Sequence, residues 1–380
     1  MGFQQQWLPD DWSESLLVGR ILTAEGPTPV LVRDGRCLDL TAIAPTISDL
    51  LERLEPGAPI EGGRDLGALG AAELLAPVDL QCIKAAGVTF AISAIERVIE
   101  ERAGGDHLKA ADIRERIQAR IGRDLRSVRP GSPAAADLKA VLVGEGLWSQ
   151  YLEVAIGPDA EIFTKAPVLS AVGAGAQVGV LRASQWNNPE PEIVLIADSH
   201  GRVRGATLGN DVNLRDIEGR SALLLGKAKD NNASCAIGPF IRLFDDRFTI
   251  DDIRQAEVNL LIEGKEDGYR LSGSSNMALI ARDPLDLMEQ VMCASHQYPD
   301  GVALFLGTMF APTEDRGATG MGFTHKHGDI VRISTPRLGA LVNSVVPSDE
   351  APPWTFGIRA LMANLAGRGL LSDRDIIACH

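Results

Sequence analysis

The stretch NNPEPEIVLIADSHGRVRGATLGNDVNLRDIEGRS, residues 187–221, contains two aliphatic, β-branched segments on either side of a small polar turn at residues 199–201. Such segments are typical of strands, and the turn between them predicts a β-hairpin. Side chains two residues apart on a strand share a face, so Glu190 and Glu192 point to one side. Asp211 can meet them there from the second strand. The sequence thus predicts one site with three carboxylates.

This carboxylate set predicts a divalent metal ion. Ligation by oxygen alone favours Mg²⁺, Mn²⁺ or Ca²⁺ over zinc. Two glutamates at alternate strand positions are more often a solvated face, which is the competing interpretation. Arg215 and Asp216, however, add two charges within five residues of Asp211. An exposed strand does not need them, and we therefore favour a metal site.

The remaining sequence indicates an α+β, β-rich fold in two domains. The chain has 380 residues, whereas single cores usually stop growing at about 250–300 residues. Residues 15–43 alternate in polarity around a turn at 34–36, which predicts a small β-rich N-terminal domain, residues 1–75. After residue 150, short β-branched segments separated by Gly and Asp turns predict a β-rich catalytic domain, residues 76–380.

Helical patterns are fewer. Residues 46–54 have helical spacing with Thr46 or Ser48 as the N-cap, and a Gly/Pro-rich linker is expected over 55–67. Residues 90–103 place apolar residues on one face and charges opposite, and the glycine pair at 104–105 ends this helix. Further along, we expect a charged helix, an exposed Pro/Gly-rich loop and a closing helix that packs on the sheet: 109–126, 129–137 and 354–371, respectively.

Composition excludes several classes of partner. The formal net charge is −14 and the pI is near 5.0, so neither nucleic acid nor a membrane surface is an expected partner, and an anionic substrate needs local cations. No apolar run reaches the roughly 18–20 residues of a spanning helix, and the N-terminus has no signal-peptide pattern. The five cysteines are scattered, without a CxxC pair. We expect a cytoplasmic protein.

Three motifs, PEPE (189–192), GNDVNLRDIEGRS (209–221) and AKDNNASCAIGP (228–239), resemble the signature of the fumarylacetoacetate hydrolase superfamily. The resemblance covers roughly residues 80–365. It implies a mixed β-sandwich roll as the catalytic domain, which commonly assembles as a homodimer or homotetramer. It also implies that Glu190, Glu192 and Asp211 bind the metal ion.

The same resemblance assigns further site residues. Lys229 matches the family's active-site lysine, in preference to Lys227, because it stands six residues before the Cys of a Cys-x-x-Gly-Pro segment. Thr308 matches a catalytic threonine. Glu161 and Lys165 match a segment near the site, although either is equally well a surface charge. Substrate contacts are expected from eight residues: Thr89, Ser93, Lys165, Arg215, Asp216, Ser274, Ser275 and Gly307. The two serines, Ser274 and Ser275, are also explained by a turn between strands.

One departure from the family pattern bears on the reaction. Hydrolases of this family carry a His-x-x-Glu dyad on a lid helix, after a Gly-x-Asn-Tyr turn. The matching stretch here is GVTFAISAIER, which places Thr89 at the Asn, Ser93 at the His and Glu96 at the Glu. Serine is a poor general base near neutral pH, so the base for hydrolysis is missing.

The pattern of KAAGVTFAISAIERVIEE, WNNPEPE and HQYPDGVALFLGTMFAPT is similar to the family's 2-keto-3-deoxy-pentonate dehydratase branch. This implies conversion of a small 2-oxo sugar acid of the D-xylonate or D-arabinonate series to 2,5-dioxopentanoate, by enolate formation and loss of the C4 hydroxyl. Lys229 would act as base or as electrostatic stabiliser, and Glu96 or Glu161 as acid. The alternatives are a hydrolase of a 2,4-dioxo acid, a decarboxylase or tautomerase, and a sugar-acid-binding protein without activity.

Overall fold

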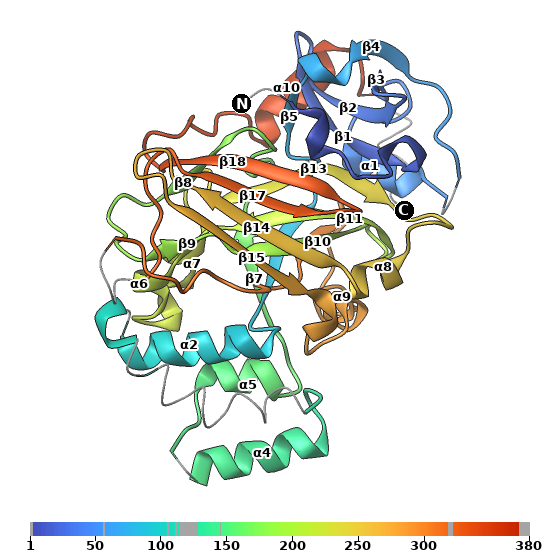
Figure 1. Ribbon diagram of the computed structural model, residues 1–380. Helices are drawn as coiled ribbons and strands as arrows, with labels where there is room; N and C mark the ends of the chain where they lie inside the picture. The colour runs from blue at the N-terminus through green and yellow to red at the C-terminus, as the bar shows by residue number, and fades with distance from the viewer. Residues whose placement is uncertain are drawn as a thin grey trace.

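Two β-sheets stacked face to face form the body of the molecule (Figure 1). The computed structural model describes residues 3–55, 58–104, 106–110, 113, 128–144, 146–317 and 322–371. The larger sheet has 11 strands, with β5 (Glu73–Leu75) beside β1 and the others in the order β4 (Arg64–Ala68), β3 (Arg36–Asp39), β2 (Gly26–Arg33), β1 (Leu17–Thr23), β13 (Cys235–Leu243), β11 (Val203–Asp211), β10 (Pro191–Ala197), β16 (Val302–Phe305), β6 (Cys82–Gly87) and β7 (Glu161–Ala166).

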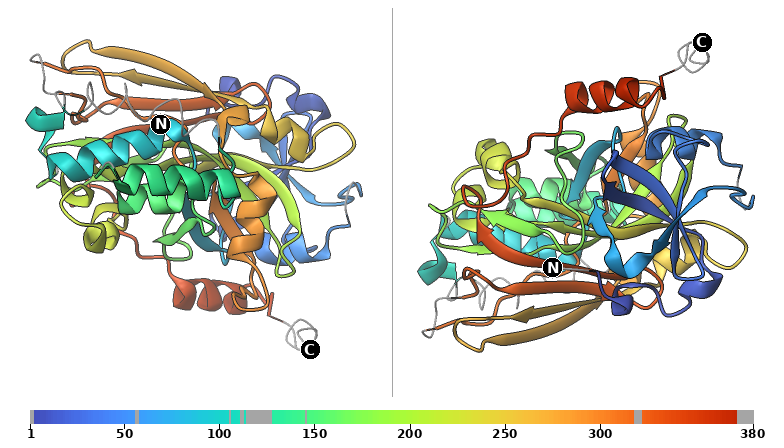
Figure 2. Two further views of the ribbon diagram at one scale, coloured as in Figure 1. Left: turned by 90° about the horizontal axis from the view of Figure 1, so that it is seen from below. Right: turned by 90° about the horizontal axis from the view of Figure 1, so that it is seen from above.

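The second sheet has five strands, in the order β15 (Arg270–Asn276), β14 (Glu257–Glu263), β17 (Ile330–Thr335), β18 (Gly339–Pro347) and β8 (Gln177–Val180). Seen from below and above, it lies along one side of the molecule and α10 (Ile358–Gly367) along the other (Figure 2). Strands β16 and β6 are parallel, as are β18 and β8, so both sheets are mixed. The predicted β-rich α+β fold is confirmed.

Alternating side chains explain the stacking. Strand β14 buries every second residue, including Val258, Leu260 and Ile262, while its other positions are mostly exposed. These residues join Ile193 and Leu195 of β10 in one apolar cluster between the sheets. A strand with one apolar face needs a partner surface on that side only. Because β10 belongs to the inner sheet, all seven of its residues are buried.

The N-terminal strands continue the large sheet, because Leu17 and Val18 of β1 pair with Arg242 and Ile241 of β13. Helix α1 (Ile47–Arg53), capped by Thr46 as predicted, covers this part of the sheet within a second apolar cluster. The linker expected over 55–67 is partly wrong, since β4 begins at Arg64 and pairs with β3. The domain boundary near residue 75 stays a prediction.

Helices cover one end of the sandwich (Figure 1). Helix α2 (Ala91–Ala103) ends at Gly104, whose φ of +63° suits glycine, as the glycine pair predicted. The loop expected over 129–137 is wrong from Pro133 onward: α4 (Pro133–Gly144) begins there, because Ser132 accepts the Ala135 N–H and proline fits the first turn. Most of the helix expected over 109–126 lies outside the described residues.

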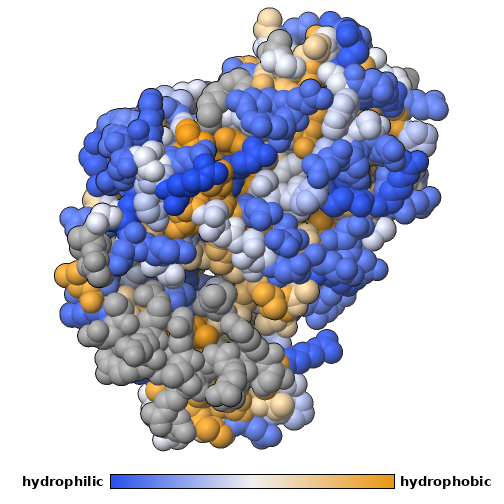
Figure 3. Space-filling view, in the orientation of Figure 1, coloured by the Kyte–Doolittle hydropathy of each residue, from blue (hydrophilic) through white to orange (hydrophobic). Residues whose placement is uncertain are grey.

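The remaining helices are short: α5 (Gln150–Ile156), α6 (Arg215–Glu218), α7 (Leu225–Lys229), α8 (Ile250–Arg254) and α9 (Pro284–Val291). A small pair of strands, β9 (Asn187–Asn188) and β12 (Asn213–Leu214), lies beside α6 and α7. The closing helix α10 packs on the turn between β1 and β2, where Asn364 donates to the Glu25 carbonyl. The face in Figure 3 is largely hydrophilic, with apolar side chains gathered at its lower end, near α4. No described helix has the length and apolarity to cross a membrane.

Candidate active site

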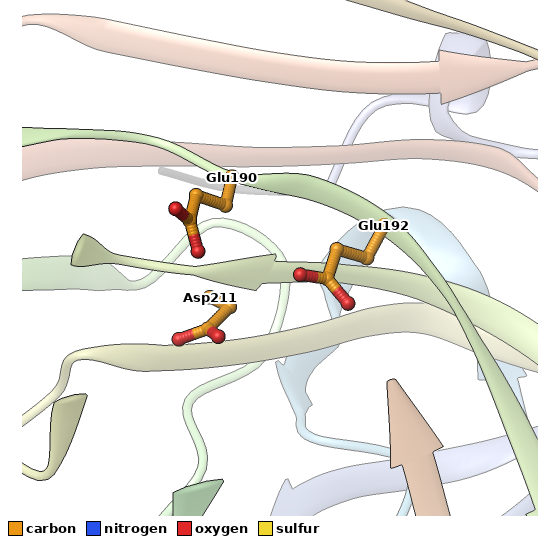
Figure 4. Close-up of side chains that lie close together, drawn as sticks. All are labelled: Glu190, Glu192 and Asp211. Carbon is orange, nitrogen blue, oxygen red and sulfur yellow. The ribbon is translucent and has the colours of Figure 1, made fainter. Parts of the chain in front are cut away.

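The β10–β11 hairpin brings the three predicted carboxylates together (Figure 4). Pro191 pairs with Asn210, and the Asp211 N–H donates to the Glu190 carbonyl at 3.1 Å, so Glu190 and Asp211 are direct neighbours. Ligand oxygens of Glu190, Glu192 and Asp211 all lie within 4.8 Å of one another. Their exposed fractions are 2%, 1% and 1%. The competing interpretation, a solvated strand face, is therefore wrong for this hairpin.

Three cationic side chains lie against these carboxylates. Lys229, at the end of α7, donates from Nζ to Glu190 Oε2 and, at 2.9 Å, to Asp211 Oδ2. Lys165 Nζ is 2.9 Å from Asp211 Oδ1, and Arg97 Nη2 is 2.8 Å from Glu190 Oε1. Burial alone would lower the pKa of Lys229, but the charges of Asp211 and Glu190 outweigh it and raise that pKa. The ammonium form is thus favoured in this arrangement.

Glu192 has a different environment. Its Oε2 accepts the Gly307 N–H at 2.7 Å and its Oε1 accepts the Thr308 hydroxyl at 3.3 Å, but no ion pair joins it to any residue that the structure describes. Burial, reinforced by Asp211 and Glu190, raises the pKa of Glu192 well above its ordinary value. A hard divalent cation between the three carboxylates would offset this cost, and an all-oxygen donor set suits such an ion. The residues therefore fit a metal centre.

A cavity of about 270 Å³ adjoins this cluster. Its walls come from α2, from β15, from the segment after β16 and from α6. Five predicted site residues lie on it: Ser93, Glu96, Arg215, Ser274 and Thr308. Glu190 also reaches the cavity, so the carboxylate cluster and the polar walls belong to one site.

Other predicted residues lie behind these walls. Lys165 is fully buried beside Asp211, so the surface-charge interpretation is wrong for it. The Thr89 hydroxyl donates to the Leu306 carbonyl at 2.7 Å. A Cβ on Gly307 would overlap with the Thr89 Oγ1, and the φ of Gly307 is +101°, so only glycine fits there. Thr89 therefore holds the Gly-Thr segment that contacts Glu192.

Three further residues are placed outside the cavity wall. Asp216 accepts the Ser184 hydroxyl at 2.7 Å and the Gln185 N–H at 2.9 Å, which holds the segment before β9. Ser275 lines a neighbouring cavity next to Phe90. Glu161 begins β7 opposite Gly87, and burial raises the pKa of its carboxyl, although Arg97 and Lys229 oppose that shift.

Sequence reasoning missed Arg97, Glu100 and Glu218. Arg97 Nη1 is 2.6 Å from both Glu100 Oε2 and Glu218 Oε2, and Arg215 Nε is 3.1 Å from Glu100 Oε1. Burial, opposed by Arg97 and Lys229, raises the pKa of Glu218 to about 7. A signal was present, because Ser93, Arg97 and Glu100 recur at helical spacing. They share the polar face of α2, which faces the site.

We expect Lys229→Met to destabilise the EDTA-treated protein by about 3–5 kcal/mol, because it leaves two buried carboxylates without their shared cation. Urea denaturation would measure the loss. Lys227→Met is the matched control, since Lys227 lies on the same helix with its side chain exposed. Equal stability of the two variants would contradict the ion-pair geometry described above.

The family model described as fumarylacetoacetate (FAA) hydrolase C-terminal matches residues 155–346. The 2-dehydro-3-deoxy-D-arabinonate dehydratase of Saccharolobus solfataricus is 28% identical over 257 residues, which cover 63% of this chain and 81% of that protein. A probable 2-keto-3-deoxyxylonate dehydratase of Haloferax volcanii is 30% identical over 196 residues, or 51% and 63% of the two chains.

Solved structures show the same fold. The apo form of 2-keto-3-deoxy-D-arabinonate dehydratase has a TM-score of 0.62 at 19% identity, covering 87% of this chain and 99% of that one. A complex of that dehydratase with magnesium and 2,5-dioxopentanoate has a TM-score of 0.60 at 20% identity, with the same coverage. Fumarylacetoacetate hydrolase from Exiguobacterium antarcticum has 0.56 at 17%, covering 88% and 100%. Taken with its buried carboxylate cluster and its stacked mixed sheets, the matched region shows that this chain belongs to the fumarylacetoacetate hydrolase family.

Proposed function

We propose that this protein is a Mg²⁺-dependent dehydratase that converts a 2-keto-3-deoxy-pentonate of the D-xylonate or D-arabinonate series to 2,5-dioxopentanoate. The observation that carries the proposal is the buried carboxylate cluster beside a cavity wall that presents Ser93. Of the described residues that line this cavity, none is a histidine able to activate water. The dehydratase names of the two curated relatives support the same reaction class.

The chemistry divides among the residues of the site. Glu190, Glu192 and Asp211 would hold Mg²⁺, which when bound polarises a 2-oxo group and acidifies the C3 hydrogens of the substrate. Lys229 contacts two of these carboxylates and is assigned to the C3 proton, either by removing it or by stabilising the negative charge that follows. Its position between the carboxylates favours the ammonium form, which suits stabilisation of the negative charge, whereas removal of the proton requires the neutral amine.

Departure of the C4 hydroxyl needs a proton donor. Glu96 lies on the cavity wall, whereas Glu161 has a carboxyl whose pKa is raised above its ordinary value by burial. We assign the donor role to one of these two carboxyls. Neither Glu96 nor Glu161 is one of the three metal ligands, so a proton can be delivered while the ligands stay ionised.

The cavity also suits an anionic, hydroxylated substrate. Arg97 and Arg215 line it, but both are ion-paired with buried glutamates, so the net positive charge that an anionic substrate needs would come from the metal ion. Ser93, Ser274 and Thr308 offer hydroxyls that both donate and accept hydrogen bonds, as sugar-acid hydroxyls require. A cavity of about 270 Å³ is near the lower end of small-molecule sites and matches a short-chain acid.

The direct test follows turnover by NMR. EDTA-treated protein, with and without added Mg²⁺, is given 2-keto-3-deoxy-D-xylonate or its C4 mirror image, 2-keto-3-deoxy-L-arabinonate. We expect 2,5-dioxopentanoate from 2-keto-3-deoxy-D-xylonate, and only when Mg²⁺ is present. If neither acid is turned over and pyruvate is released from a 2,4-dioxo acid, the protein is a hydrolase and the proposed dehydratase activity is wrong.

The two neighbouring serines of β15 provide a test of substrate contact. Ser274 lines the site cavity, whereas Ser275 lines only the neighbouring cavity next to Phe90, which Ser274 also reaches. We expect Ser274→Ala to change the kcat/KM ratio between five- and six-carbon 2-keto-3-deoxy acids roughly 5- to 10-fold, the effect of one hydrogen bond. Ser275→Ala should leave the ratio unchanged. An equal effect of both substitutions would argue against the contact.

A further inference from the structure

Each carboxylate of the cluster has one oxygen held by a donor of its own. The second oxygens of Glu190 and Asp211 instead converge on Lys229 Nζ. Three donors contact one oxygen each: Arg97 Nη2 lies 2.8 Å from Glu190 Oε1, the Gly307 N–H donates to Glu192 Oε2 at 2.7 Å, and Lys165 Nζ lies 2.9 Å from Asp211 Oδ1. One oxygen of each ligand is thereby oriented by the protein, while the other contacts Lys229 in Glu190 and Asp211 and the Thr308 hydroxyl in Glu192.

Arg97 differs from the other two donors in where it is anchored. Lys165 lies on β7 and Gly307 directly follows β16, so both are fixed by the large sheet. Arg97 lies on α2, the helix that presents Ser93 and Glu96 to the cavity. Of these three donors, Arg97 is the one that lies on a helix rather than on a strand or directly after one.

Helix α2 also packs in a core of its own. Its buried residues Val98 and Ile99 join Leu142 of α4 and Leu152 of α5 in an apolar cluster distinct from the clusters of the sheets. Figure 1 shows these three helices as a layer at one end of the sandwich. Arg97 therefore connects two packing units, the helical layer and the hairpin that carries the carboxylates.

The guanidinium makes this connection rigid. Arg97 contacts Glu190 through Nη2, and Glu100 and Glu218 through Nη1, with only a tenth of its side chain exposed. A planar guanidinium offers donors in fixed directions, so these contacts set its orientation. A ligand carboxylate oriented by such an outer partner binds metal more tightly, because less freedom is lost on coordination.

We propose that Arg97 is a positioning residue that holds Glu190 for the metal ion and thereby couples metal binding to the placement of helix α2. This inference rests on the proposed metal site but not on the dehydration reaction. The metal ion would bind to a Glu190 carboxylate that Arg97 has already oriented. Ser93, one turn before Arg97, and Glu96, directly before it, would then take their places on the cavity wall when the metal ion binds.

The test measures Mn²⁺ affinity without substrate, by titration of the EPR signal of free Mn²⁺. We expect Arg97→Met to weaken binding roughly 10- to 100-fold, the usual effect of losing an outer-shell partner. Arg97→Lys should fall between Arg97→Met and the wild type, because it restores a charge but not the fork, and it also serves if Arg97→Met does not fold. Arg242→Met is the matched control: it removes a buried arginine whose ion pair is with Asp11.

Hydrogen exchange of residues 91–103, with and without Mg²⁺, tests the coupling. In the wild type we expect Mg²⁺ to slow exchange in this helix, and in Arg97→Met we expect that slowing to be lost. An Mn²⁺ affinity of Arg97→Met within twofold of the wild type, or no effect of Mg²⁺ on the helix in the wild type, would overturn the inference. A wild type that binds no Mn²⁺ would overturn it together with the proposed metal site. Normal metal binding without turnover of either pentonate would remove the dehydratase alone.

Discussion

Burying three carboxylates side by side is the constraint on which this structure depends. Each charge taken out of water costs several kcal/mol unless a partner offsets it, and three like charges repel one another as well. Glu190, Glu192 and Asp211 are almost wholly buried. The surrounding chain meets this cost with cations from three different elements, Arg97 on α2, Lys165 on β7 and Lys229 on α7. A metal ion would supply the compensation that Glu192 lacks.

The fold provides a rigid frame for this cluster. The β10–β11 hairpin lies inside the large sheet, with β16 on one side and β13 on the other, so its register cannot shift without disrupting both neighbours. In the segment that directly follows β16, the Gly307 N–H donates to the Glu192 carboxylate. The helical layer closes the site from the side and leaves a cavity between α2 and β15. Strands inside the large sheet therefore hold the three carboxylates, and a separately packed helix carries Ser93 and Glu96 on the cavity wall.

Local patterns were sufficient for part of this arrangement. Alternation along a strand and a short polar turn predict the hairpin, and with it the meeting of Glu190, Glu192 and Asp211. The start of α4 was missed because its Ser-Pro beginning also fits a loop. Arg97 was missed because a charged helix face usually meets solvent, and only the tertiary structure places the α2 face against Glu190. Which of Ser274 and Ser275 lines the cavity depends on where β15 lies relative to α2 and the segment after β16, which the sequence leaves open.

The central claim is that the three carboxylates form a metal centre. The most direct measurement is anomalous diffraction near the manganese absorption edge, from crystals grown with Mn²⁺. The account predicts a peak bounded by oxygens of Glu190, Glu192 and Asp211, with the Lys229 ammonium withdrawn from at least one of its two carboxylates. A crystal with no peak at this position, in which Lys229 still joins Glu190 to Asp211, would contradict it.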